Sequence, residues 1–164
     1  MAGPVYRFLA HDHKRLDDLL NRAVADPEKL DVEAYAEFRS GLLKHISIEE
    51  KILLPAAQRY RGGTPLPIAS KIHLDHGALV ALMVPPPTTV LVSTIRSILT
   101  AHNKLEEEVE GLYEVSESTI GKDADELLAM MQSAADVPVL PHNADPKALE
   151  ATRRAVERAG YSMD

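Results

Sequence analysis

Cysteine and tryptophan are absent from this 164-residue sequence, and aromatic residues make up only 4% of it. Without cysteine there can be no disulfide, iron–sulfur cluster, thiolate zinc site or cysteine nucleophile. The absence fits a cytoplasmic protein, because disulfides are typical of oxidising compartments. A core with so few aromatic rings has to be built from aliphatic side chains, and this composition favours helices over a β-sandwich.

The sequence also lacks a basic stripe and a long apolar run. Its formal net charge is −7, so we expect no binding to nucleic acid or to an anionic membrane. No apolar run approaches the roughly 20 residues that a membrane-spanning helix needs. Charged residues begin at Arg7, which is too early for a signal peptide.

Proline and glycine divide the chain into helical segments. Apolar residues recur at helical spacing in four stretches, which predicts helices beginning at Pro4, near Asp31, near Pro67 and at Thr88 or Thr89. The last of these is expected to run through Tyr113. Four amphipathic helices with short breaks predict an all-α, up-down-up-down four-helix bundle over residues 1–118.

Two further helical segments follow, at 123–135 and 146–160. Residues 119–164 therefore form a helical C-terminal extension, which we expect to pack on the outside of the bundle or against a partner subunit in a homodimer. Pro55 falls inside the second main helix, where it removes a hydrogen bond and predicts a kink after Leu54.

Each main helix carries a histidine in the middle of its apolar stripe. These histidines are His13, His45, His76 and His102. The second and fourth helices add a glutamate four residues later, Glu49 and Glu106. Because positions i and i+4 lie roughly 40° apart on a helix, each glutamate shares the inward face with its histidine.

The same helical geometry separates these residues from their polar neighbours. Glu50 and Glu107 lie roughly 140° from the inward histidine of their helix and should face water or the flank of the bundle. His11 lies roughly 160° from His13 and should be exposed. His73 lies only roughly 60° from His76, at the edge of the inward face, and could add a ligand to one metal ion.

Burying these polar groups without partners would be very costly. Either they satisfy one another in a network of hydrogen bonds and ion pairs, or they bind metal. Imidazole and carboxylate without thiolate suit iron, manganese or zinc. Repetition favours metal, because an Asp-His pair followed by His-x-x-x-Glu occurs in both halves of the chain, first from Asp12 and again from Asp75. Two glutamates on facing helices could bridge two ions and leave open positions for a small molecule such as dioxygen.

Four segments around these residues resemble the hemerythrin-like family, also called the HHE cation-binding domain family. They are LAHDHKRLDDLL, KHISIEEKILLP, IHLDHGALVALM and AHNKLEEEVEGLY, and they cover the first three-quarters of the chain. The resemblance implies a four-helix bundle with a non-haem di-iron centre that, in the best-known members, binds dioxygen reversibly. It also implies that two iron ions are held by the inward-facing residues, His13, His45, Glu49, His76, His102 and Glu106.

Two departures separate the chain from the oxygen-carrying members. Those proteins place two histidines four residues apart on the third helix, where this chain has Ile72 and His76. They also use an aspartate at a longer spacing on the fourth helix, where this chain has Glu106. Both differences favour the bacterial, functionally varied branch of the family. The resemblance supplies iron, whereas the ligand set alone would also accept manganese or zinc.

Three functions are compatible with this pattern. The favoured one is non-enzymatic binding or sensing of dioxygen or another small diatomic ligand such as nitric oxide. The second is a di-iron enzyme that breaks down peroxide or repairs iron centres, which needs a proton donor such as Tyr35, Tyr113 or His73. The third is a binding module in which the metal is structural and the C-terminal tail recruits a partner.

Overall fold

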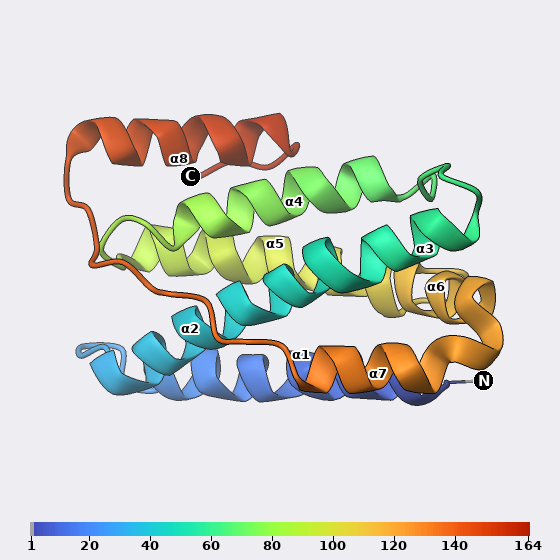
Figure 1. Ribbon diagram of the computed structural model, residues 1–164. Helices are drawn as coiled ribbons and strands as arrows, with labels where there is room; N and C mark the ends of the chain where they lie inside the picture. The colour runs from blue at the N-terminus through green and yellow to red at the C-terminus, as the bar shows by residue number, and fades with distance from the viewer. Residues whose placement is uncertain (1) are drawn as a thin grey trace. The chain divides into compact units, whose positions relative to one another are not determined.

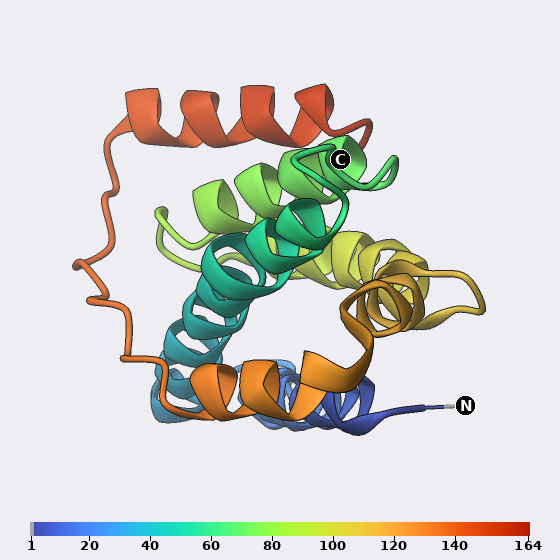
Figure 2. The same ribbon diagram turned by 45° about the vertical axis from the view of Figure 1, so that its right-hand side comes forward.

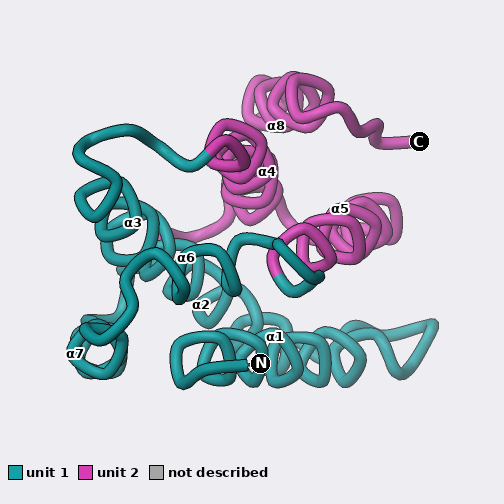
Figure 3. The backbone as a smooth tube through the Cα atoms, turned by 90° about the vertical axis from the view of Figure 1, so that its right-hand side faces the viewer, with its two compact units in different colours: residues 1–66, 107–139 teal, residues 67–106, 140–164 magenta. Residues whose placement is uncertain are grey.

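The computed structural model describes residues 2–164, and every regular element among them is helical (Figure 1). This confirms the predicted all-α class. The chain divides into two compact units (Figure 3). Unit 1 comprises Met1–Leu66 and Glu107–Val139, and unit 2 comprises Pro67–Glu106 and Leu140–Asp164. These units divide the chain at positions other than residue 118, so the domain boundary expected there stays a prediction.

Unit 1 is built around the first helical hairpin, α1 (Pro4–Ala23) and α2 (Val32–Ile48). Pro4 occupies the first helical position, where its missing N–H costs nothing. Asp31 caps α2, with its side chain accepting a hydrogen bond of 3.0 Å from the Ala34 N–H. Both predicted helix starts are confirmed. The hairpin buries aliphatic residues together with Phe38, and α6 (Leu112–Ile120) and α7 (Ala124–Gln132) pack against α1.

The helix that contains Pro55 widens instead of only bending. A π-helical turn, η1 (Glu49–Leu53), separates α2 from α3 (Leu54–Tyr60), and the Leu54 N–H donates to the Glu49 carbonyl. In a regular α-helix the ring of Pro55 would collide with the carbonyl four residues before it. The wide turn directly before the proline provides room for the ring. Such turns are frequent at functional sites, and Glu49 is the first residue of this one.

The fourth predicted helix does not continue to Tyr113. α5 (Thr89–Glu107) ends six residues earlier, and α6 begins at Leu112 after a break in which Glu110 has a φ of 61°. Negative charge from successive glutamates at a helix C-terminus opposes the helix dipole, and Gly111 disfavours continuation. As a result Val109, which lies between the two helices, is 82% exposed, and Tyr113 belongs to a new helix.

Unit 2 contains α4 (Ala69–Leu82), α5 and α8 (Pro146–Arg158). α8 lies along α4, as the red and green helices of Figures 1 and 2 show. The buried Thr152 hydroxyl donates to the Ala81 carbonyl at 3.0 Å, and Gly160 ends the segment with a φ of 94°. Val80 on α4 is 40% exposed, although it is four residues after the buried His76. The position lies one step from the buried Leu79, which takes the inward place.

Among residues 2–164, no helix has both the length and the apolar composition that crossing a bilayer requires. A homodimer stays a prediction.

Candidate metal centre

Unit 1 brings together three of the inward-facing residues. His13 comes from α1, His45 from α2 and Glu49 from the first position of η1, and all three are buried. One potential ligand atom of each lies within 4.8 Å of the others. His45 Nε2 is 3.0 Å from Glu49 Oε1, and the two imidazole centroids are 4.7 Å apart. We call these three residues the first triad.

Unit 2 repeats this arrangement with His76 on α4 and His102 and Glu106 on α5. All three are buried, and one potential ligand atom of each again lies within 4.8 Å of the others. His102 Nε2 is 3.0 Å from Glu106 Oε1, and the imidazole centroids are 4.8 Å apart. This second triad shows that the repeat in the sequence is also a repeat in local geometry.

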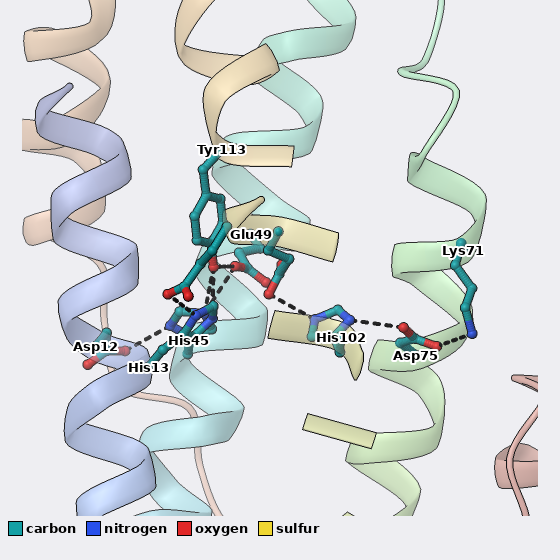
Figure 4. Close-up of polar contacts among 10 residues, drawn as sticks. Asp12, His13, His45, Glu49, Lys71, Asp75, His102 and Tyr113 are labelled. Atoms are coloured by element: carbon teal, nitrogen blue, oxygen red, sulfur yellow. Dashed lines mark hydrogen bonds and ion pairs between the residues drawn. The ribbon is translucent and has the colours of Figure 1, made fainter. Parts of the chain in front are cut away.

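An aspartate orients the second histidine of each triad (Figure 4). Asp12 Oδ2 lies 2.9 Å from His45 Nδ1, and Asp75 Oδ2 lies 3.1 Å from His102 Nδ1. When Nδ1 donates its proton to a carboxylate, the lone pair of Nε2 is left for a metal ion. Both aspartates belong to the repeated Asp-His motif, so the sequence contained them without revealing their contact with a histidine on another helix.

Charged neighbours keep these aspartates ionised. Burial raises the pKa of Asp12, but hydrogen bonds with His45 and Arg15 outweigh it and lower the pKa to about 2. Burial likewise raises the pKa of Asp75, and hydrogen bonds with His102 and Lys71 lower it overall. Both carboxylates are therefore charged at neutral pH and can accept a hydrogen bond from the imidazole Nδ1–H.

Two other side chains contact a triad histidine or an aspartate that orients one. Glu107, expected to face water or the flank of the bundle, is 36% exposed, yet its Oε1 lies 3.0 Å from His13 Nδ1. Lys71 Nζ lies 2.7 Å from both Asp75 Oδ1 and the Ala159 carbonyl. Lys71 thus connects the end of α8 to the aspartate that holds His102. The helical angle of Glu107 did not reveal this contact, because a long side chain can bend toward a residue of another helix.

Tyr113 is fully buried, and its hydroxyl oxygen contacts the first triad. The oxygen lies 2.9 Å from His13 Nε2, 3.3 Å from His45 Nε2 and 2.5 Å from Glu49 Oε1 (Figure 4). The sequence indicated Tyr113 only as one of several proton donors, because a continuous fourth helix would place it about two turns beyond Glu106.

The other polar residues considered from the sequence lie outside the two triads. His73, considered as an additional ligand, is exposed on α4, and His11 is exposed as expected. Tyr35 is buried on α2 with its ring 6.1 Å from that of Phe38, and burial raises its pKa to about 12. Glu50 is partly exposed beside Glu49. The structure thus brings together three residues in each unit and leaves His73 at the surface.

The donor set of each triad fits a metal ion. Ligands at right angles around an octahedral ion, each about 2.1 Å from it, lie roughly 3.0 Å apart. The histidine Nε2 to glutamate Oε1 separation is 3.0 Å in both triads. Two imidazoles and one carboxylate suit iron, manganese or zinc.

Buried, repeated His/Glu triads on an all-helical chain define a helical metal-binding protein. The sequence matches the family described as the Hemerythrin HHE cation binding domain over residues 5–111. This match spans more than half of the chain and contains both triads. The chain therefore belongs to the hemerythrin HHE cation-binding family, whose fold is a four-helix bundle. Neither curated proteins nor solved structures give a match.

Proposed function

We propose that this protein is a non-haem di-iron protein that binds or senses dioxygen or a related small ligand such as nitric oxide. The observation that carries the proposal is the repeat of the same three donors, with the same 3.0 Å separation, in both units. One triad alone would support a single ion. Two matched triads support one ion on each.

The proposed ligands are the six buried residues of the triads, His13, His45 and Glu49 for one ion and His76, His102 and Glu106 for the other. Three protein donors would leave an ion with further positions for small ligands, and iron would supply the affinity for diatomic molecules. Membership of a cation-binding family supports metal binding, whereas the choice of iron over manganese or zinc is part of the proposal.

The chain's own residues prepare the triads for metal. Asp12 and Asp75 accept a hydrogen bond from the Nδ1–H of the histidines that they contact, which leaves the Nε2 lone pair beside the glutamate of the same triad. Buried aliphatic side chains such as Leu9 and Ile98 accompany the triads on their helices and limit the access of water.

A second candidate is a di-iron enzyme that acts on peroxide or in iron-centre repair. The observation that favours it is the buried hydroxyl of Tyr113 beside the first triad, which could supply a proton during turnover.

One experiment separates the two functions. Anaerobically purified protein is loaded with ferrous iron, its metal is counted per chain, and optical spectra are recorded with and without dioxygen or nitric oxide. The proposal expects about two irons per chain and a ligand-dependent band that is lost when the gas is removed. Rapid consumption of added peroxide without a reversible spectral change would favour the enzyme. Retention of zinc in place of iron, or no response to either gas or to peroxide, would contradict both.

The ligand assignment has a matched pair of variants. His102→Ala removes a buried donor of the second triad and should lower the iron content, whereas His11→Ala changes an exposed histidine and should not. Equal iron contents in the two variants would contradict the assignment.

A further inference from the structure

We propose that Tyr113 is a ligand of the metal ion held by the first triad, which makes the two metal positions chemically different. The inference rests on the proposed function, because it requires an ion on the first triad. It adds a donor, a phenolate oxygen, that neither the His-x-x-x-Glu pattern nor the family match assigns.

The contacts of the hydroxyl carry the inference. Its oxygen lies between 2.5 and 3.3 Å from the three donor atoms of His13, His45 and Glu49. Donor atoms that share one octahedral ion lie roughly 3.0 Å from one another. The Tyr113 oxygen therefore already stands at the spacing of a fourth ligand. An ion entering the triad must either bind this oxygen or displace it.

Displacement is opposed by the packing of the ring. Tyr113 is fully buried, with its ring in an edge-on contact with Tyr6 at 5.8 Å and tilted over the His13 ring at 5.5 Å. A fully buried ring with these contacts cannot turn its hydroxyl away without opening the core of unit 1. Binding of the oxygen is the alternative that leaves this packing intact.

The break between α5 and α6 places the side chain. Gly111 is the N-cap of α6 with extended backbone, and Tyr113 is the second residue of the new helix. The left-handed backbone of Glu110 redirects the chain immediately before it. A backbone conformation that a non-glycine residue rarely adopts is thus used to bring one phenol to the triad.

Coordination of Tyr113 exchanges its O–H bond for an oxygen–metal bond and releases one proton to the solvent. The hydroxyl hydrogen already points to Glu49, whose Oε1 accepts it. Unit 2 has one tyrosine in its sequence, Tyr161, and the ring of this tyrosine lies 4.5 Å from the Lys71 amine.

The phenolate of Tyr113 should also affect oxidation of the ion that it binds. An anionic phenolate favours the ferric over the ferrous ion, so the ion on the first triad should be the more readily oxidised.

The test compares Tyr113→Phe with Tyr6→Phe. Both remove one hydroxyl and keep the ring, and the two rings pack against each other, but the Tyr6 hydroxyl donates to the Glu107 backbone carbonyl. Wild-type protein and both variants are loaded with iron and oxidised. Metal content, visible absorption and resonance Raman spectra are then recorded, with circular dichroism to confirm folding.

We expect a phenolate-to-iron(III) charge-transfer band with enhanced tyrosine ring vibrations in the wild type and in Tyr6→Phe, and its loss in Tyr113→Phe. Iron affinity at one of the two positions should also fall about tenfold or more in Tyr113→Phe. A fully loaded wild type without phenolate vibrations would overturn the inference and leave the proposed function standing. The same would follow if Tyr113→Phe kept the band. A wild type that binds no iron would overturn both.

Discussion

Asp75 offers the most quantitative test of how the triads are prepared for metal. Its side chain is fully buried, and it contacts His102 Nδ1 at 3.1 Å and Lys71 Nζ at 2.7 Å. The variant Asp75→Asn keeps the size and one acceptor oxygen but removes the charge. Hydrogen bonds to charged groups contribute about 1.5–3 kcal/mol each, and loss of an outer carboxylate lowers metal affinity about 10–100-fold.

The burial of the two aspartates decides where in these ranges each variant falls. Asp12 makes the equivalent contact to His45 but is 22% exposed, so solvent screens part of its charge. We therefore expect Asp75→Asn to lower the free energy of unfolding by about 3 kcal/mol and Asp12→Asn by about 1.5 kcal/mol. The loss of metal affinity should follow the same order, nearer 100-fold for Asp75→Asn and nearer tenfold for Asp12→Asn.

Denaturant unfolding of the metal-free protein and competition with a chelator measure the two quantities. Asp18→Asn, which changes an exposed aspartate on α1, is the control and should alter neither. The reasoning would be refuted if Asp75→Asn matched Asp18→Asn in both assays, or if Asp12→Asn proved the more damaging change.

Three further changes test other parts of the account. Lys71→Met should detach the end of α8 from Asp75. We expect a several-fold loss of metal affinity in chelator competition and faster proteolysis of α8. Glu110→Gly relieves a left-handed backbone and should raise the free energy of unfolding by up to about 1 kcal/mol, whereas Glu108→Gly should lower it. Pro55→Ala should let the π turn tighten, and we expect iron affinity to fall although circular dichroism shows no loss of helix; unchanged affinity would mean that the turn does not position Glu49.

Helical periodicity was sufficient to predict the all-α class and the burial of the triad residues. Apolar spacing fixes which face of a helix turns inward, and a histidine in the middle of that face is carried inward with it. The capped start at Asp31 and the proline start at Pro4 were also predictable, because each depends on one local interaction. The identity of the metal and the roles of the six triad residues as its ligands are proposals.

The break before α6 and the contacts of Glu107 were not predictable in the same way. The break depends on a left-handed conformation at Glu110, which no residue type specifies. The contact between Tyr113 and the first triad depends in turn on that break. The partners of the histidines were equally hidden, since Asp12 and Asp75 reach histidines that follow 33 and 27 residues later.

Metal counting shows whether each triad holds one metal ion. Wild-type protein and the double variant His45→Ala/His102→Ala are loaded with ferrous iron, freed of excess metal, and measured for iron per chain by elemental analysis. We expect about two irons per chain in the wild type and almost none in the double variant. Equal iron contents in the two proteins, or a wild type that retains no iron, would contradict this expectation.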